Sequence, residues 1–283
     1  MLKIAIQKSG RLYEDSVKLL KECGIELNNG NKQLKTAAFN FPLEVYFLRD
    51  DDIPQYVFDG VADVGIVGEN VLLEKGKDIE LLYRLGFGRC RLSIAVPKAM
   101  KYESINDLKG LKIATTYAGM LQQYLTKNKV DAEIHEISGS VEIAPGIGLA
   151  DAICDLVSSG STLFTNGLKE VETVLESEAV LAVNKDLPED KQAILQKLLL
   201  RINAVKTAKN NKYILLNAPN HQLQNIFRLL PGMKSPTVVN LAEEGWSSVQ
   251  SVVNENQFWD VIEKLKQFEA EGIIVIPIEK MIV

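Results

Sequence analysis

The sequence is poor in cysteine and histidine. Its 283 residues include three cysteines and two histidines. Cys23, Cys90 and Cys154 are odd in number and far apart, which excludes a disulfide framework and a CxxC site. With only His135 and His221, a three-histidine metal centre is excluded as well. We expect Cys90 and Cys154 to be buried rather than nucleophilic, and both histidines to be surface or structural residues.

A basic surplus and a long apolar run are also missing. Against 32 lysines and arginines stand 37 aspartates and glutamates, which argues against nucleic-acid binding. The longest strongly apolar stretch, residues 272–278, is far shorter than the roughly 20 residues of a membrane-spanning helix. No signal-peptide core precedes the first apolar stretch, so we expect a soluble cytoplasmic protein with no nucleic-acid or membrane partner.

Two common nucleotide-binding motifs are absent. The sequence has no Walker A pattern, and Gly86-Phe87-Gly88 lacks the third glycine of the dinucleotide fingerprint. What is present is an ordinary globular composition, with 46% hydrophobic and 24% charged residues. This is enough apolar material for sizeable cores.

Strand and helix patterns alternate from the first residues to about residue 206. The expected strands are residues 2–7, 43–48, 61–67, 91–96, 112–115, 132–137, 152–157 and 179–184, and the expected helices are residues 13–23, 120–126, 142–149, 162–175 and 187–206, with one more opening at residue 50. Such alternation indicates an α/β fold of βαβ units with largely parallel sheets. We expect residues 179–206 to return to the lobe formed by residues 1–90. Residues 91–178 then form a second lobe, with a ligand cleft between the two.

Residues 207–283 have a different order of elements. The expected elements are a strand at 213–217, a helix at 221–230, strands at 237–241 and 247–253, a helix at 257–268 and a strand at 273–278. This βαββαβ order is that of ferredoxin-like domains. We therefore expect a third, C-terminal domain.

The most informative segment joins the strand at 152–157 to a loop of small residues. Asp155 lies near the carboxyl end of the strand, and the loop consists of Ser158, Ser159, Gly160, Ser161 and Thr162. Backbone N–H groups in such a loop bind anions, the hydroxyls add donors, and glycine permits close approach. With Asp155 accepting hydrogen bonds from sugar hydroxyls, the pattern predicts a ribose-5-phosphate cradle. A serine-rich N-cap on an ordinary helix fits the spacing equally well.

Charged residues follow the first two expected strands. Lys8 and Arg11 flank a glycine turn at the carboxyl end of the first strand, where they suit a polyphosphate or form a solvated turn. Arg49 follows the second strand and precedes three aspartates. Of these, Asp51 and Asp52 are candidate Mg²⁺ ligands, although an acidic run is more typical of a helix N-terminus.

The third expected strand is bounded by further polar residues. Asp63 and the turn Gly68-Glu69-Asn70 end this strand. They are candidates for orienting a base or a ribose. The same residues suit any tight strand–helix loop.

Taken together, these segments resemble a known family. Glu142, Gly148, Ala150, Ile153, Asp155, Leu156, Ser159, Gly160, Thr162 and Leu163, at this spacing, are similar to the signature of the ATP phosphoribosyltransferases, which catalyse the first step of histidine biosynthesis. Residues 6–12, 49–54, 63–71, 88–92 and 276–280 resemble the same family, so the resemblance spans essentially the whole chain. Because of its βαββαβ tail the chain is similar to the long form, which carries its own regulatory domain; the short form works with a separate regulatory subunit.

The resemblance implies a reaction, a fold and partners. ATP and 5-phosphoribosyl 1-pyrophosphate (PRPP) would give N1-(5-phosphoribosyl)-ATP and pyrophosphate, with ATP reacting through adenine, so that no P-loop is needed. The implied fold is two-lobed, like a type II periplasmic binding protein, with a ferredoxin-like regulatory tail. Mg²⁺ dependence, assembly of dimers into a hexamer, and feedback inhibition by histidine are implied as well.

The resemblance also suggests roles for the candidate catalytic and substrate-binding residues. Residues 158–162 would hold the 5-phosphate of PRPP, and Asp155 the ribose hydroxyls. Lys8 and Arg11, with Mg²⁺, would stabilise the departing pyrophosphate or hold ATP phosphates. Arg11, Arg49, Asp63 and Glu69 are the candidates for binding ATP.

For the regulatory tail and for the protein as a whole, alternatives stay open. Asn217, Ser235 and Thr237 offer polar groups to histidine, and would serve equally as turn residues and strand caps. The rival function is a non-catalytic cytoplasmic bilobal sensor of a phosphorylated metabolite, because a fold does not fix a function.

Overall fold

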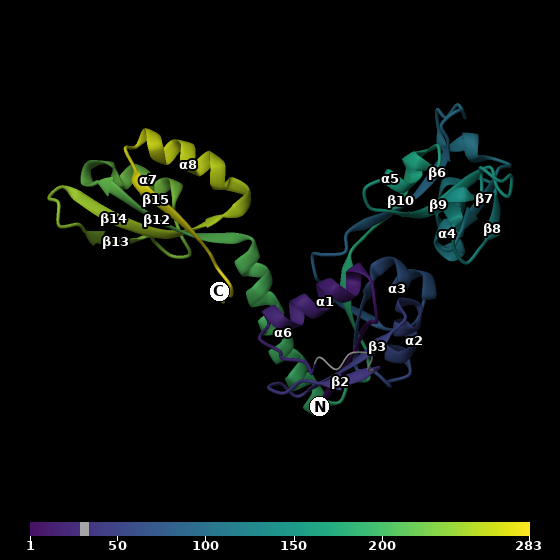
Figure 1. The fold of residues 1–283 in the computed structure, drawn as a ribbon, viewed down its shortest axis with the longest axis horizontal. Helices are drawn as coiled ribbons and strands as arrows, with labels where there is room; N and C mark the ends of the chain where they lie inside the picture. Colours follow the sequence, from purple (N-terminus) through teal and green to yellow (C-terminus); the bar gives the residue numbers. More distant parts are fainter. Residues whose placement is uncertain (29–33) are drawn as a thin grey trace. The chain divides into compact units, whose positions relative to one another are not determined.

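The computed structural model describes residues 1–28 and 34–283, which form two compact units (Figure 1). The first unit comprises Met1–Lys18 and Glu26–Gln192. The second comprises Leu19–Ile25 and Ala193–Val283. Three sheets organise the chain, of six, five and four strands.

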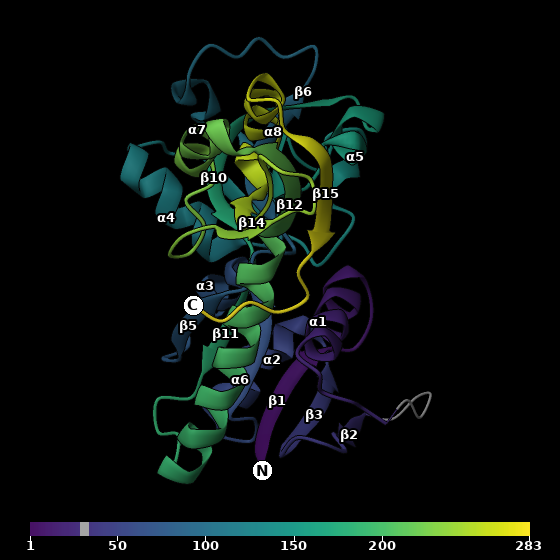
Figure 2. The same cartoon turned by 90° about the vertical axis from the view of Figure 1, so that its left-hand side faces the viewer.

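The six-stranded sheet of the first unit has the strand order β2-β3-β1-β4-β11-β5. Its strands are β1 (Leu2–Gln7), β2 (Lys35–Ala37), β3 (Leu43–Leu48), β4 (Val64–Gly68), β5 (Glu80–Arg84) and β11 (Ala179–Val183). β1 pairs in parallel with both β3 and β4, and Figure 2 shows β1 and β3 side by side. β11 returns to this sheet as expected, but antiparallel to β4 and β5. The expectation of a largely parallel sheet is therefore wrong: β11 begins where β4 ends and runs back along it, and β2 is antiparallel to β3 as well.

Helices follow the three parallel strands of this sheet. α1 (Arg11–Glu22) follows β1, a 3₁₀ turn (Asp50–Asp52) and α2 (Ile53–Phe58) follow β3, and α3 (Glu69–Lys75) follows β4. Buried aliphatic side chains of the strands and of α2 and α3 form a core. Because parallel strands end at one edge, the residues after β1, β3 and β4 share that edge, where α/β proteins bind ligands.

The five-stranded sheet has the order β10-β6-β9-β7-β8. Its strands are β6 (Cys90–Pro97), β7 (Lys112–Thr115), β8 (Glu133–Glu136), β9 (Ala152–Val157) and β10 (Leu168–Ser177). One face packs on α4 (Ala118–Asn128) through a core that includes Ile94, Ile113 and Leu121. The other face is covered by apolar residues of the segment 141–150 and by Leu163 of α5 (Ser161–Thr165).

Two expected helices of this region are wrong. The segment 142–149 forms only a 3₁₀ turn (Val141–Ile143) followed by turns, because Pro145, Gly146 and Gly148 interrupt it. The segment 162–175 stops being helical after Thr165. Gly167 has a φ of 70°, and the chain continues as β10, which pairs antiparallel with β6. Strands β2 and β5 were not expected from the sequence at all.

The second unit contains most of α6 (Glu189–Lys209) and the four-stranded sheet. The sheet order is β13-β14-β12-β15, and every neighbouring pair is antiparallel. Its elements are β12 (Asn211–Pro219), α7 (Leu223–Leu229), β13 (Thr237–Asn240), β14 (Trp246–Asn254), α8 (Phe258–Gln267) and β15 (Glu271–Pro277). Both helices pack on one face around Ile214, Leu216 and Val249 (Figure 1). The prediction of a ferredoxin-like βαββαβ fold is confirmed.

Candidate functional site

The loop after β9 lines a pocket of about 210 Å³. The lining consists of Glu142, Asp155, Leu156, Val157, Ser158, Ser159, Gly160, Ser161, Thr162 and Leu163. Gly160 has a φ of 77°, in the left-handed region that favours glycine, and α5 begins directly after it. The hydroxyl oxygens of Ser159 and Ser161 lie 3.0 Å apart. The structure thus brings Asp155 and the whole small-residue loop, residues 158–162, into one pocket. We call Asp155 and this loop together the cradle.

Asp155 is the acidic member of the cradle. Burial raises the pKa of its carboxyl group, and the neighbouring charge of Glu142 raises it further, against a hydrogen bond from the Leu156 backbone. That N–H donates to Oδ1 at 2.8 Å. Among the described residues, no group donates to Oδ2. A carboxylate held in this way is suited to accept hydrogen bonds from ligand hydroxyls.

Cationic side chains lie at the carboxyl edge of the six-stranded sheet. Lys8 follows β1 and its backbone N–H donates to the carbonyl of Leu48 at 2.8 Å, while Arg49 follows β3, the neighbouring strand. Arg11 begins α1 after Gly10, whose φ is 86°. All three cationic side chains are exposed and, within residues 1–28 and 34–283, none forms an ion pair. They are free to meet an anion.

Glu69 lies at the same edge but is already engaged. It is buried at the start of α3 and forms an ion pair with Arg84. Arg84 also lies 3.9 Å from Glu178, the residue before β11. Glu69 therefore holds the edge together through Arg84.

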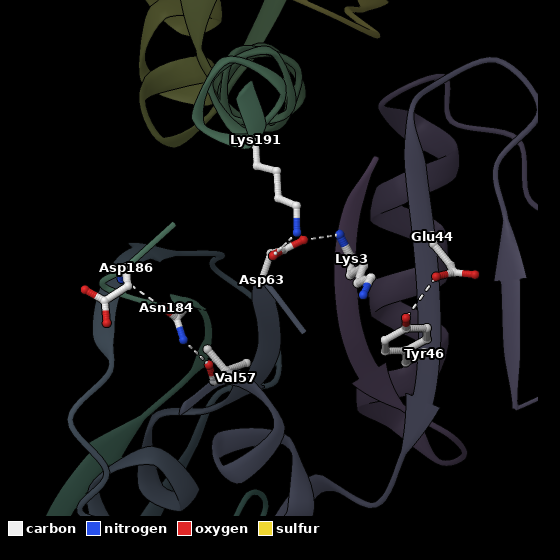
Figure 3. A network of polar contacts seen from close by, with 8 residues as sticks. All are labelled: Lys3, Glu44, Tyr46, Val57, Asp63, Asn184, Asp186 and Lys191. Atoms are coloured by element: carbon white, nitrogen blue, oxygen red, sulfur yellow. Dashed lines mark hydrogen bonds and ion pairs between the residues drawn. The ribbon is translucent and has the colours of Figure 1, made fainter. Parts of the chain in front are cut away.

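Asp63 lies at the opposite edge of the sheet (Figure 3). It precedes β4 instead of ending it, so its expected place beside Glu69 is wrong; the strand begins three residues later than the apolar run suggests. The Lys3 backbone N–H donates to Oδ2 at 2.7 Å, and Lys191 Nζ lies 2.8 Å from Oδ1. The side chain is buried, and with both oxygens occupied it joins β1 to the start of α6.

A second pocket, of about 560 Å³, adjoins the cradle and was missed by the sequence analysis. Its lining is Glu69, Arg84, Arg89, Cys90, Arg91, Ser158, Glu176, Ser177 and Glu178. Ser158 is common to this pocket and the cradle. The lining holds three arginines and three glutamates: Arg84 pairs with Glu69, and Arg84 and Arg89 lie 3.9 Å and 3.7 Å from Glu178. The segment 88–92 was the sequence signal that pointed here. Burial raises the pKa of the Cys90 thiol, which is half-buried, and that of the fully buried Cys154, so neither is an activated nucleophile.

A third pocket, of about 960 Å³, is lined from both sheets of the first unit. Asp50, Asp51 and Glu74 come from the helices after β3 and β4, and Tyr117 comes from the start of α4. The Asn70 amide donates to the Tyr117 hydroxyl at 3.1 Å. These contacts connect the helices of the two sheets within the first unit.

The candidate metal ligands do not form a protein cage. Asp51 Oδ1 lies 3.8 Å from Lys75 Nζ, and Asp52 is exposed. In the described part of the chain, no three or more histidine, cysteine, aspartate or glutamate side chains cluster as a metal site. This donor set fits an ion such as Mg²⁺, which keeps its waters and takes most of its other oxygens from substrate phosphates.

The candidate histidine ligands lie on the four-stranded sheet. Asn217 is in register with Ser248, and Thr237 with Gln250, so both point to the face opposite α7 and α8. β14 separates β12 from β13, so these two side chains are two strands apart. Ser235 is exposed just before β13.

Comparison with known proteins follows the same division of the chain. A family model described as ATP phosphoribosyltransferase matches residues 49–204, and one described as "HisG, C-terminal domain" matches residues 208–280. The ATP phosphoribosyltransferase of Cytophaga hutchinsonii is 61% identical over 282 residues, which cover 100% of this chain and 99% of that protein. That of Bacteroides thetaiotaomicron is 56% identical over 283 residues, covering 100% of both.

Solved structures give a matching result over about three quarters of the chain. A chain of the ATP phosphoribosyl transferase (HisG:HisZ) complex from Thermotoga maritima aligns with a TM-score of 0.61 and 29% identity, covering 72% of this chain and 99% of that one. A periplasmic sulfonate-binding protein SsuA from Methylobacillus flagellatus aligns with a TM-score of 0.50 and 18% identity, covering 73% and 67%. The second likeness concerns the fold alone, and it confirms the expected periplasmic-binding-protein architecture.

Among the helices of residues 1–28 and 34–283, none has the length and apolar character of a membrane-spanning helix.

Proposed function

The chain belongs to the ATP phosphoribosyltransferase family, in its long form, and from that membership we propose how its own residues carry out the reaction. The family reaction transfers the 5-phosphoribosyl group of PRPP to N1 of the adenine of ATP and releases pyrophosphate, at the start of histidine biosynthesis. The sensing module without catalysis is not favoured, because relatives as similar as 61% identical are named for the transferase activity.

PRPP is proposed to bind in the cradle. Backbone N–H groups and hydroxyls of residues 158–162 would hold the 5-phosphate, and Gly160 in its left-handed conformation lets the backbone approach the phosphate. Asp155 would accept hydrogen bonds from the ribose hydroxyls through the oxygen that no described residue uses. The observation that carries this proposal is the single pocket that Asp155 shares with the loop.

ATP and the departing pyrophosphate are proposed to meet the cations of the six-stranded sheet edge. Lys8, Arg11 and Arg49 are exposed there without ion pairs to any described residue, which suits them for polyphosphate. Glu69 would orient ATP only indirectly, since its carboxylate is committed to Arg84. Asp63 has no place in this proposal, because it lies at the other edge with both oxygens engaged.

The proposed chemistry needs no covalent intermediate on the protein. The adenine N1 lone pair forms the bond to C1 of the ribose while the bond from C1 to the pyrophosphate oxygen breaks, and its electron pair leaves with pyrophosphate. Lys8 and Arg11 would stabilise the negative charge that develops on the leaving group, and the cradle would fix the position of C1. Mg²⁺ bound to the substrate phosphates, with Asp51 and Asp52 as candidate protein contacts, would neutralise part of that charge.

Regulation, assembly and location complete the proposal. Histidine is proposed to inhibit by binding the four-stranded sheet at Asn217, Ser235 and Thr237.

The relative from Thermotoga maritima is a subunit of a complex, which supports an oligomeric state for this chain. We propose that the chain forms dimers and that these dimers assemble into a hexamer. A biosynthetic enzyme that uses ATP and PRPP is proposed to work in the cytoplasm.

A turnover assay tests the proposed function. The full chain is mixed with ATP, PRPP and Mg²⁺, with pyrophosphatase present to draw the reaction forward, and near-ultraviolet absorbance reports N1-substituted adenine. We expect product only when both substrates are present, and less product when histidine is added. Saturable binding of one phosphorylated ligand without release of pyrophosphate would instead support the sensing module.

A further inference from the structure

Glu170 lies on β10 and uses both carboxylate oxygens to hold two residues of β6. Arg91 Nη2 donates to Oε2 at 2.5 Å, and Arg91 Nε donates to Oε1. The buried hydroxyl of Ser93 donates to Oε1 as well, at 2.7 Å. The guanidinium of Arg91 and then the Ser93 hydroxyl lower the pKa of Glu170, so the carboxylate is ionised at neutral pH.

Arg91 and Ser93, the two residues that Glu170 binds, lie on β6 next to β9, the strand that leads into the cradle loop. Arg91 is opposite Val157, and Ser93 is opposite Asp155. Directly opposite residues of an antiparallel pair point to the same face of the sheet. The two β6 residues that Glu170 holds therefore lie opposite the sugar-binding candidate and the last strand residue before the phosphate loop.

Arg91 reaches the loop itself. Its Nη1 donates to the carbonyl oxygen of Ser158 at 3.5 Å, and both residues line the second pocket. The loop that follows Ser158 is largely exposed, and its hydrogen bonds run within the loop and to α5, such as the one between the Ser159 and Ser161 hydroxyls. The bond from Arg91 links the start of this loop to β6. Because Glu170 binds the Arg91 guanidinium through Nε and Nη2, the orientation of that group is fixed. The position of Nη1, which donates to Ser158, is thereby fixed as well.

We propose that Glu170 is a positioning residue for PRPP: through Arg91 it holds the loop at its first residue, Ser158, in the shape that accepts the 5-phosphate. The proposal rests on the proposed function of the cradle. Glu170 does not touch the substrate, because its two oxygens are occupied by Arg91 and Ser93. It also balances the charge of Arg91 together with Glu176, which lies opposite Arg91 in the register of β10 and β6.

Glu170→Gln tests the proposal on the full chain. The amide keeps the shape but loses the charge that grips the guanidinium, so we expect the Kd of PRPP, measured by calorimetry, to rise about tenfold. KM for PRPP should rise in parallel, while KM for ATP and kcat at saturating PRPP stay unchanged. Arg91→Lys keeps a cation but lacks the fork, and should raise the Kd of PRPP in the same way. It serves as the second measurement if the glutamine variant does not fold.

Glu172→Gln is the matched control. Glu172 lies two residues further along β10, and its carboxylate accepts hydrogen bonds from Tyr102 and Tyr124. Tyr124 belongs to α4, which covers the other face of the sheet, so Glu172 does not contact the cradle. This variant loses a carboxylate of the same strand and should bind PRPP like the unaltered chain.

Several results would overturn the proposal. The first is an unchanged Kd of PRPP in both Glu170→Gln and Arg91→Lys. Another is an equal rise of that Kd in Glu172→Gln, because it would show general loosening of β10. If Asp155→Asn weakens PRPP binding and Glu170→Gln does not, the positioning role fails while the cradle stands. If neither variant changes the Kd of a chain that still makes product, the cradle itself is misplaced.

Discussion

The carboxylate of Glu74 accepts a hydrogen bond from the backbone N–H of Gly119 at 2.8 Å. Its second oxygen accepts another from the N–H of Met120 at 2.9 Å. Glu74 belongs to α3, which follows the six-stranded sheet, and Gly119 to the first turn of α4, which covers the five-stranded sheet. A carboxylate at a helix N-terminus satisfies orphan N–H groups and complements the helix dipole. This contact therefore joins the two sheets of the first unit.

Replacing Glu74 should loosen that connection. Glu74→Gln keeps one acceptor but removes the charge, so we expect the free energy of unfolding to fall by about 1 kcal/mol. Urea unfolding followed by circular dichroism measures it. Glu80→Gln, at an exposed glutamate of β5, is the control and should leave stability unchanged. An equal loss in both variants would show that the contact contributes nothing specific.

Asp63 should matter for stability and not for catalysis. Asp63→Asn removes a buried charge that faces Lys191, and we expect it to lower the free energy of unfolding by roughly 1–3 kcal/mol. KM for ATP should not change, because Asp63 lies at the edge away from Lys8 and Arg49. Denaturation and steady-state kinetics on the same preparation separate the two effects. A raised KM for ATP at unchanged stability would contradict this placement.

The Glu170–Arg91 pair predicts a pH dependence of stability. Because Arg91 lowers the pKa of Glu170 from its ordinary 4.5, the folded state binds fewer protons than the unfolded state in the interval between the two pKa values. The contribution is fully present above pH 4.5 and is lost as the pH falls through the folded pKa. Unfolding free energies between pH 7 and pH 3 should therefore decline less steeply in Glu170→Gln. Parallel curves for the two proteins would contradict the pair.

The histidine proposal makes a separable prediction. Asn217→Ala should raise the histidine concentration for half-maximal inhibition about tenfold or more, through loss of a ligand hydrogen bond, without changing kcat when histidine is absent. Asn211→Ala is the matched control, because Asn211 lies at the other end of β12, where its amide donates to the carbonyl of Thr207. Histidine inhibition that is unaffected in the Asn217 variant would remove this residue from the proposed regulatory site.

Four strands of the first unit could be predicted well from the sequence. The strands expected at residues 2–7, 43–48, 112–115 and 152–157 have the same bounds in the structure. They are short runs of buried aliphatic residues that end at polar turns, the clearest strand pattern a sequence offers. The shared edge of Lys8, Arg49 and Glu69 followed from the parallel pairing of their strands.

β10 shows why the rest escaped prediction. Its apolar residues Leu168, Val171 and Leu175 recur at helical spacing, because two irregularities in the pairing with β6, between Glu170 and Glu172 and between Thr173 and Leu175, disturb the two-residue alternation. The sequence analysis expects a helix at residues 162–175, and a helix there gives no reason to pair Glu170 with Arg91 of β6. That contact joins residues 79 positions apart and depends on the strand pairing itself.

The central claim is that Asp155 and the loop 158–162 bind PRPP. The most direct test is the Kd of PRPP for Asp155→Asn beside Asp151→Asn, a control just before β9, where Asp151 accepts a hydrogen bond from the backbone of Lys112. We predict that the Asp155 variant binds PRPP at least about tenfold more weakly, since a charged acceptor for the ribose hydroxyls is lost, and that the control binds it normally. Unchanged PRPP binding by a folded Asp155→Asn protein would contradict the account.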